Sequence, residues 1–176
     1  GSASLSASDV DGDDLTYSIS EGTDITATLT GSDISFSAPD NFNGSEIFTV
    51  STSDSEYVDS QTITVTVNAV NDVPVATVGL SGSTNEDQST VITLSGSDVD
   101  GDNLTFSLSS DATDGSVTLD GALATYTPDA NYSGDDSFTF SVSDGSESSS
   151  ASISLSVSAV NDAPVLATVL DVSFDE

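Results

Sequence analysis

Residues 62–70 read TITVTVNAV, and residues 152–160 read SISLSVSAV. In both stretches an apolar residue alternates with Ser, Thr or Asn. Successive side chains of a β-strand point to opposite faces of its sheet, so the alternation predicts two strands, each buried on one face only. Because the stretches share this pattern at an offset of 90 residues, we expect the chain to contain a repeat.

The repeat runs through most of the chain. SASDVDGDDLTYSI from residue 6 matches SGSDVDGDNLTFSL from residue 95, an offset of 89. APDNFNGSEIFTVSTSD from residue 38 matches TPDANYSGDDSFTFSVSD from residue 127 after one inserted residue, so the offset becomes 90. A period of about 90 residues equals one small domain, and the sequence therefore predicts two copies of one folded unit.

Seven alternating runs fit in the second copy, separated by Gly, Asp, Asn and Pro. They cover approximately residues 74–80, 90–96, 103–109, 114–119, 122–127, 137–143 and 150–159. Seven short antiparallel strands predict an all-β fold, a two-sheet sandwich of the immunoglobulin type with strands A to G. Cys and Trp are absent, so we expect a core of aliphatic and aromatic side chains, including Phe138 and Phe140 and, in the first copy, Phe48 and Val50.

The period divides the chain into three segments. Residues 1–72 are expected to form a sandwich that lacks its own strand A, and residues 73–162 a complete sandwich. Residues 163–176 match strand A of a following repeat, and they could equally serve as a donor strand for a neighbouring copy. Met is absent, so we expect the sequence to be a piece of a longer or processed chain.

The charge of the chain restricts its partners. It carries 30 acidic residues and no Lys, Arg or His, a formal net charge of −30 at pH 7, so the counter-charge must come from solution. Phosphate groups are bound mainly by Lys and Arg, which argues against nucleic acid and anionic membranes as partners. No apolar run approaches the roughly eighteen residues that cross a bilayer, so we expect no membrane insertion by this segment.

Carboxylates recur in register at the ends of the expected strands. Asp98, Asp100 and Asp102 lie between strands B and C, and Asp144 lies between F and G. These loops meet where the linker Asn71–Asp72 enters the domain. Hard oxygen ligands in that number suit Ca²⁺, which accepts six to eight of them in flexible geometry. Mg²⁺ demands a stricter octahedron, and Zn²⁺ is disfavoured without Cys or His.

A second group of oxygen donors is expected at the opposite end of the sandwich. It combines Glu86 between strands A and B, and Asp136 between E and F, with the next linker, Asn161–Asp162. One period after Glu86 stands Glu176. The complete set of predicted calcium ligands is Asp9, Asp11, Asp13, Glu46, Asp54, Asn71, Asp72, Glu86, Asp98, Asp100, Asp102, Asp136, Asp144, Asn161, Asp162 and Glu176.

Two alternatives compete with this metal hypothesis. The loop DVDGDNLTFSLS resembles an EF-hand only superficially, because its Gly is the fourth residue instead of the sixth and Ser stands in the twelfth position, where Glu is needed. Acidic turns can also serve solubility alone, since Asp and Gly are common turn residues. Calcium is favoured because the acidic positions recur in both copies and converge on the linkers.

Several motifs occur in a fixed order: AVNDxPV at both linkers, NED before strand B, SDVDGDxLT, and PDANYSGDDSFTFSVSDG. In this combination the chain resembles the cadherin-like tandem repeats of large bacterial calcium-binding surface adhesins of the RTX and VCBS type. The resemblance covers nearly the whole chain. It implies extracellular, immunoglobulin/cadherin-like seven-strand β-sandwiches joined end to end by calcium-binding linkers, between a cell anchor and a binding tip.

These features predict a structural, non-enzymatic function. The chain is expected to be a calcium-rigidified extender or fibre segment at the cell surface, whose partners are adjacent repeats or further copies of itself, with residues 165–174 as a candidate completing strand. The alternative is a calcium-dependent carbohydrate-binding module for surface glycans, which the absence of Trp and Arg disfavours. A carboxylate-pair glycosidase is disfavoured because the carboxylates lie in repeated end loops instead of a single cleft.

Overall fold

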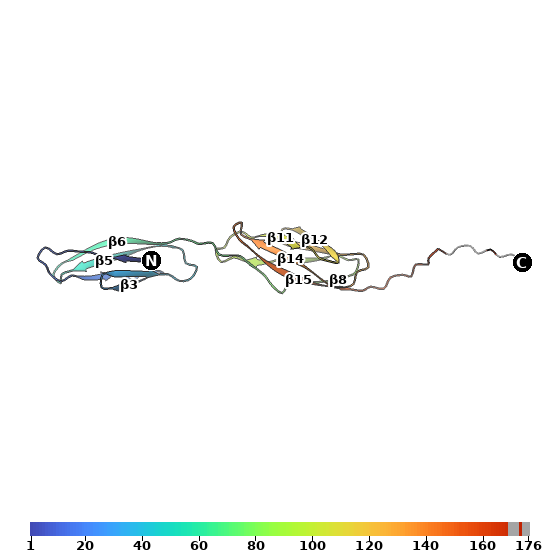
Figure 1. The fold of residues 1–176 in the computed structure, drawn as a ribbon, viewed down its shortest axis with the longest axis horizontal. Helices are drawn as coiled ribbons and strands as arrows, with labels where there is room; N and C mark the ends of the chain where they lie inside the picture. Colours follow the sequence, from blue (N-terminus) through green and yellow to red (C-terminus); the bar gives the residue numbers. More distant parts are fainter. Residues whose placement is uncertain (169–172, 174–176) are drawn as a thin grey trace. The chain divides into compact units, whose positions relative to one another are not determined.

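The fold is described by a computed structural model, which covers residues 1–168 and residue 173 (Figure 1). The chain divides into two compact units, Gly1–Asn71 and Asp72–Glu176. Each unit is a β-sandwich, and the described residues contain no helix, which confirms the predicted all-β class. The interpretation of residues 163–176 as strand A of a following repeat, or as a donor strand for a neighbouring copy, stays a prediction.

Unit 1 is built from two sheets of three strands each within residues 1–71. Its strands are β1 (Ser2–Ser4), β2 (Thr16–Ile19), β3 (Thr26–Thr30), β4 (Asp33–Ser37), β5 (Gly44–Ser53) and β6 (Val58–Val67). One sheet has the order β1-β4-β3 and the other the order β2-β5-β6, with every pair antiparallel. The alternation of TITVTVNAV thus places Ile63, Val65 and Val67 on the inner face of β6.

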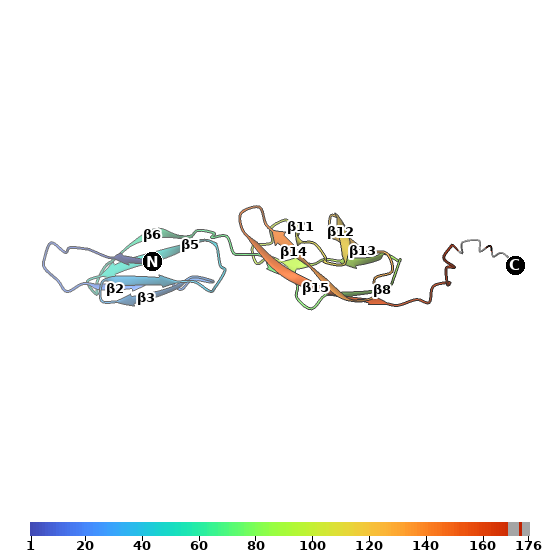
Figure 2. The ribbon, with the colours of Figure 1, turned by 45° about the vertical axis from the view of Figure 1, so that its right-hand side comes forward.

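Unit 2 repeats this plan with additional strands. Its described strands are β7 (Val75–Ala76), β8 (Ser81–Asn85), β9 (Thr90–Thr93), β10 (Gly96–Ser97), β11 (Thr105–Ser110), β12 (Gly115–Asp120), β13 (Leu123–Pro128), β14 (Gly134–Ser143) and β15 (Ser148–Ser158). The sheets have the orders β12-β13-β9, β11-β14-β15-β8 and β10-β7. Figure 2 shows β8 beside β15 at the end of the four-stranded sheet.

Strand A of unit 2 differs from its prediction. Instead of one strand over residues 74–80, the chain forms β7, which pairs with β10, and β8, which pairs with β15. Gly79 lies between the two strands with a φ of 78°, a left-handed conformation that Gly adopts readily because it has no Cβ. The β8–β15 pair is parallel, which corrects the expectation of antiparallel strands throughout.

The buried cores confirm the expected aromatic positions. Phe138 and Phe140 are 2% and 0% exposed, and Phe48 in unit 1 is 0% exposed; Val50 is also buried. In unit 2 these rings pack in one cluster with buried residues of β13 and β15. Aromatic side chains on the inner strand faces therefore replace the Cys and Trp that many immunoglobulin sandwiches place in their cores.

The two units differ at the edge beside their last strand. The inward-facing residues of β15 are at most 6% exposed, whereas their counterparts on β6 are half-buried or exposed. In unit 2 the edge of β15 is covered by β8, but within residues 1–71 no strand pairs with the equivalent edge of β6. Unit 1 therefore has an open sheet edge beside an incompletely covered core.

Candidate metal centre

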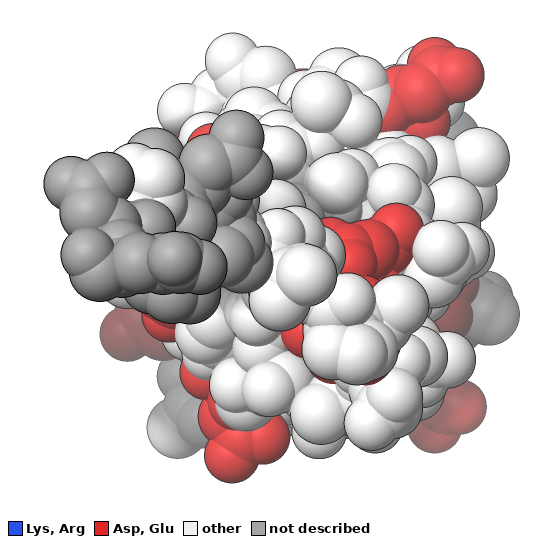
Figure 3. Space-filling view, turned by 90° about the vertical axis from the view of Figure 1, so that its right-hand side faces the viewer, with Lys and Arg blue, Asp and Glu red and all other residues white. Residues whose placement is uncertain are grey.

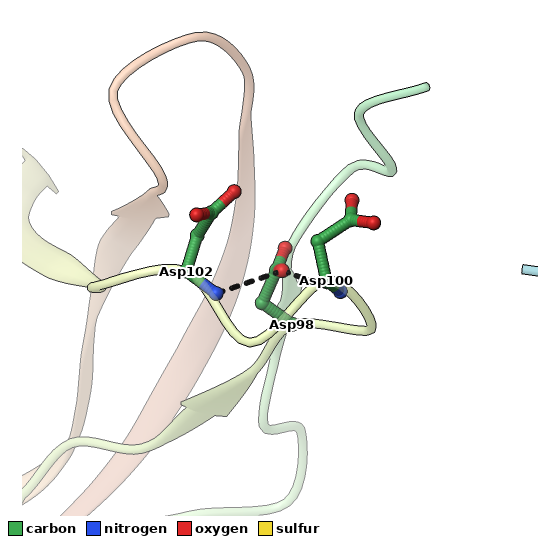
Figure 4. A group of neighbouring side chains, drawn as sticks. All are labelled: Asp98, Asp100 and Asp102. Atoms are coloured by element: carbon green, nitrogen blue, oxygen red, sulfur yellow. Dashed lines mark hydrogen bonds between the residues drawn. The ribbon is translucent and has the colours of Figure 1, made fainter. Parts of the chain in front are cut away.

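The strongest candidate site is the loop that contains Asp98, Asp100 and Asp102, which follows β10. One side-chain oxygen of Asp98, Oδ1, accepts hydrogen bonds from the backbone N–H groups of Asp100 at 2.9 Å and Asp102 at 3.3 Å. Gly101 takes a φ of 79° and completes the tight turn. As a result, the three carboxylates point to the same side of the loop (Figure 4).

The three side chains form a compact group of oxygen donors. One carboxylate oxygen from each lies within 4.8 Å of the others. At such a separation two negative charges repel by about 1 kcal/mol in water and about 3 kcal/mol at an effective dielectric constant of about 20. The other oxygen of Asp98, Oδ2, is buried and has no hydrogen-bond partner in the described part of the chain.

This arrangement fits a hard divalent cation. A buried carboxylate oxygen without a partner costs free energy, and Coulomb repulsion adds to that cost, so a cation at this point would relieve both. The donor set contains only oxygen atoms, which favours Ca²⁺ over a transition metal. Asp100 and Asp102 are exposed and Asp98 is half-buried, so an ion can reach the group from solvent.

The linker residue Asp72 lies against this loop. Its backbone N–H donates a hydrogen bond of 2.7 Å to Oδ2 of Asp100. Asp72 is half-buried. The structure therefore brings the predicted linker ligand Asp72 to the acidic loop.

Asp144 organises the hairpin turn between β14 and β15. Its Oδ1 accepts the backbone N–H groups of Ser146 at 2.6 Å and Glu147 at 2.7 Å. Asp54 does the same in unit 1 for Glu56 and Tyr57. The N–H groups of Tyr57 and then Glu56 lower the pKa of Asp54, which keeps this carboxylate ionised.

The acidic loop of unit 1 follows the same plan. Asp9 Oδ1 accepts the backbone N–H groups of Asp11, Gly12 and Asp13 at 2.8, 2.9 and 3.3 Å. Asp9 and Asp54 both line one hollow of about 180 Å³ in unit 1. The predicted approach of the loop between strands B and C to the turn between strands F and G is therefore present in this unit.

A different arrangement surrounds Glu86 at the far end of unit 2. This carboxylate is only 8% exposed, and its Oε1 accepts a hydrogen bond from the backbone N–H of Val160. Val160 directly precedes Asn161 and Asp162, so the structure brings Glu86 to the predicted second linker. The side chain of Asn161 donates to the carbonyl oxygen of Asp162 at 3.1 Å. Glu176 lies outside the described residues.

Asp136 has a different environment from the one predicted. It lies inside β14 instead of in a loop, because that strand begins at Gly134 and pairs with β15 from its first residue. Its carboxylate accepts the backbone N–H groups of Thr113 at 3.0 Å and Asp114 at 3.1 Å, and also the hydroxyl of Tyr126 at 3.0 Å. Sequence reasoning missed Tyr126, which carries no distinguishing motif.

Glu46 makes the equivalent clamp in unit 1. It accepts the backbone N–H groups of Thr23 at 3.0 Å and Asp24 at 2.6 Å. The N–H of Asp24 makes the largest contribution, and the pKa of Glu46 falls below its usual value although desolvation opposes this. For Asp136, desolvation raises the pKa, but the hydrogen bonds together lower it. Both carboxylates are thus already satisfied by protein groups, and their role as calcium ligands stays a prediction.

The surface agrees with the charge of the sequence. Figure 3 shows Asp and Glu side chains on one face and no Lys or Arg.

No helix in the described residues is long and apolar enough to span a membrane.

Comparison with known sequences decides the family. The profile of the bacterial Ig domain matches residues 1–67 and 71–156, one match for each repeat. The chain belongs to the bacterial Ig domain family. No curated protein matches it.

Solved structures extend the likeness of this bacterial Ig domain chain to cadherin repeats. Repeats EC1-2 of human protocadherin-24 superpose with a TM-score of 0.60 at 20% identity, over 92% of this chain and 88% of that one. Repeats EC1-2 of human mucin-like protocadherin give a TM-score of 0.54 at 16% identity, over 82% of this chain and 85% of that one. At these identities the likeness shows the fold alone.

An endo-fucoidan hydrolase, MfFcnA4 from glycoside hydrolase family 107, also matches, at 24% identity with a TM-score of 0.43. The match covers 86% of the bacterial Ig domain chain but only 24% of the hydrolase. A superposition this loose carries no argument about the present chain.

Proposed function

We propose that this chain is a calcium-rigidified structural segment of an extracellular adhesin or surface filament. The observation that carries the proposal is the group formed by Asp98, Asp100 and Asp102, with a buried Asp98 oxygen that has no partner in the described residues. The chain has no Lys, Arg or His to neutralise the group. A dissolved divalent cation is therefore the available source of positive charge.

Binding of Ca²⁺ would stiffen the linker through Asp72. The N–H of this residue already bonds to Asp100, so an ion held by Asp100 also restrains the start of the linker. With the ion present, the attraction of each carboxylate to the cation outweighs the repulsion between the carboxylates. Without the ion, this repulsion loosens the loop and also the linker that is hydrogen-bonded to it.

The expected affinity suits an extracellular setting. Calcium sites of extracellular modules bind at roughly 0.1–1 mM. At a tenfold excess of Ca²⁺ over the dissociation constant, one site stabilises the folded state by about 1.4 kcal/mol. This amount raises the melting temperature of a domain of this size by roughly 6–11 °C.

In this proposal the segment works as part of an end-to-end array. Residues 165–174, of which 169–172 and 174 lie outside the described residues, act in this proposal as strand A for the next unit in the array, and no catalytic step is involved. The cadherin-like fold supports this role because its tandem repeats are arranged in series along the chain.

Calorimetry and thermal unfolding test the proposal together. Titration of the EDTA-treated chain with Ca²⁺ should show saturable binding, and its melting temperature should rise with Ca²⁺ more than with the same concentration of Mg²⁺. Equal effects of the two ions would indicate non-specific screening. No heat of binding and an unchanged melting profile would refute the proposal.

A further inference from the structure

Unit 1 carries a groove beside its open edge. The groove has a volume of about 130 Å³, and its apolar lining includes Leu5, Ala7 and Val50. Asp59 and Gln61 border it from β6. Residues 5–8 belong to no strand, although the N–H of Leu5 donates to the carbonyl oxygen of Ser32 at 2.7 Å and the N–H of Ala7 donates to the hydroxyl of Tyr17 at 3.1 Å. The groove thus combines a backbone segment outside any strand with an apolar floor, and such a place can accept an added β-strand.

The equivalent place in unit 2 is occupied by the chain itself. Ala76 of β7 is 5% exposed and pairs with Gly96 of β10. Its backbone N–H donates to Oγ of Ser149 at 2.8 Å, and the N–H of Thr77 donates to the carbonyl oxygen of Ser95 at 3.0 Å. These contacts show which groups hold strand A in this fold.

The repeat transfers the contacts to unit 1. At an offset of 89, Ser95 and Gly96 correspond to Ser6 and Ala7, and at an offset of 90 Ser149 corresponds to Asp59. Unit 1 therefore presents the carbonyl of Ser6 as an acceptor at the same place. It also presents a carboxylate where unit 2 has a hydroxyl, and hydrogen bonds to ionised acceptors are the stronger kind.

The chain contains a second segment of the strand A type, residues 164–168, with the sequence PVLAT against PVATV at residues 74–78. Val165 and Leu166 are 93% and 86% exposed. Both are large apolar side chains that bury little surface against the described residues around them. This segment therefore matches the groove of unit 1 in residue type and leaves its apolar side chains available.

The side-chain sizes are complementary. In unit 2, Phe140 and the small Ala76 belong to one buried core. At the corresponding positions, the groove of unit 1 has the smaller Val50, and segment 164–168 has the larger Leu166. A large core residue and a small strand A residue in unit 2 thus correspond to a smaller core residue and a larger strand residue here. The two changes together conserve the total side-chain volume better than either change alone.

We propose that the groove of unit 1 binds segment 164–168 of a second copy of this chain as an antiparallel strand. Leu166 lies opposite Ala7 and Val165 opposite Ser8, the N–H of Ala167 donates to the carbonyl of Ser6, and the N–H of Leu166 donates to Asp59. The inference deepens the proposed function by assigning the contact that joins copies. Because groove and segment are different surfaces, the contact is heterologous and builds open head-to-tail assemblies or rings.

One position limits the fit. A Cβ added at Gly96 would lie 3.0 Å from the carbonyl oxygen of Val75 and 3.1 Å from a methyl group of Val142. Ala7 carries that Cβ in unit 1, so the bound strand must shift by a few tenths of an ångström. Ala7→Gly should consequently strengthen the contact, whereas Ala7→Phe should fill the groove. Ala7 is exposed in unit 1, so neither change removes a core contact.

A mixing experiment with full-length variants tests the proposal. The groove-blocked variant is Ala7→Phe, and the segment-blocked variant combines Val165→Asp with Leu166→Asp. In sedimentation velocity, the unmodified chain should form concentration-dependent multimers, each variant should stay monomeric, and their equimolar mixture should form a dimer and no larger species. The matched control, Val78→Asp with Val91→Asp, alters two exposed valines of unit 2 and should assemble like the unmodified chain.

A labelled peptide protects the test against misfolded variants. A fluorescein-labelled peptide of residues 161–176 should bind the segment-blocked variant, whose groove is intact, in fluorescence anisotropy. A scrambled peptide should not bind. Asp59→Ala in that variant should weaken binding roughly tenfold, because it removes an ionised acceptor. A monomeric mixture, or a peptide that does not bind, overturns the proposal.

The same samples separate this inference from the calcium proposal. Each monomeric variant is titrated with Ca²⁺ in the calorimeter. Binding of Ca²⁺ without association in the mixture refutes strand docking and leaves the metal site standing. Association without binding of Ca²⁺ refutes the metal site and leaves strand docking standing.

Discussion

The backbone N–H of Asp72 donates a 2.7 Å hydrogen bond to the carboxylate of Asp100. This bond joins the first residue of unit 2 to the acidic loop. Any ion that binds the Asp100 carboxylate is therefore coupled to the linker backbone through this one side chain. This coupling would give the proposed metal site a mechanical consequence.

Replacing Asp100 with Asn should weaken calcium binding and stabilise the metal-free chain. The substitution removes one charge from the site, which lowers Ca²⁺ affinity by roughly tenfold because affinity follows the charge of the ligands. It also removes two repulsive pairs, so the melting temperature in EDTA should rise. Calorimetry and melting curves measure the two effects. Asp120→Asn, at the exposed last residue of β12, is the control and should change neither value by much.

Monovalent salt should stabilise the metal-free chain. With a net charge of −30, the folded chain repels itself, and raising ionic strength from about 0.01 M to about 0.15 M shortens the screening length from about 30 Å to about 8 Å. The melting temperature in EDTA should rise over this range, and it should rise less when Ca²⁺ is present. A melting temperature in EDTA that does not depend on NaCl would contradict this account of the charge.

Acid should destabilise unit 2 through Asp136. Hydrogen bonds hold its pKa below the ordinary 3.8, so the folded state binds the proton less readily than the unfolded state. The stabilisation is complete above the unfolded value and is lost as the pH falls through the folded value. In urea unfolding at high salt, stability should decline below about pH 4, and Asp136→Asn should make the decline shallower. Parallel pH profiles for the two proteins would rule out this contribution.

Removing the hydroxyl of Tyr126 should also destabilise unit 2. This side chain is fully buried and donates to Asp136, and burial followed by the hydrogen bond to Asp136 raises its pKa. Tyr126→Phe should cost about 1–2 kcal/mol, because Asp114 continues to donate to the same oxygen. The melting temperature should fall by roughly 5–15 °C. Tyr57→Phe, at a 75% exposed position, is the control.

Unit 1 provides a natural comparison for this variant. Its residue at the position of Tyr126 is Phe36, and the longer Glu46 takes the place of Asp136. Glu46 holds the same pair of backbone N–H groups without help from a hydroxyl. If Tyr126→Phe were neutral, the shorter carboxylate of unit 2 would not depend on the hydroxyl donor.

The sequence alone determined the class of fold, the repeat and the acidic loop. Alternation of period two is a local property of the strand. The alternating sequence of residues 152–160 was therefore enough to predict that Ile153 and Leu155 are buried, as they are in the structure. The spacing of Asp98, Asp100 and Asp102 within one turn is equally local, and it predicted that their carboxylates gather. The charge of the chain then required the counter-ion to come from outside.

Only the tertiary structure decided the properties that depend on distant partners. Asp136 reads as a loop ligand, but pairing with β15 places it in a strand, where Thr113, Asp114 and Tyr126 donate to it. The parallel pairing of β8 likewise depends on an edge that lies about 70 residues away in the sequence. Which strands form hydrogen bonds with each other depends on which strand edges meet in the folded domain. The residue pattern of a single strand does not contain this information.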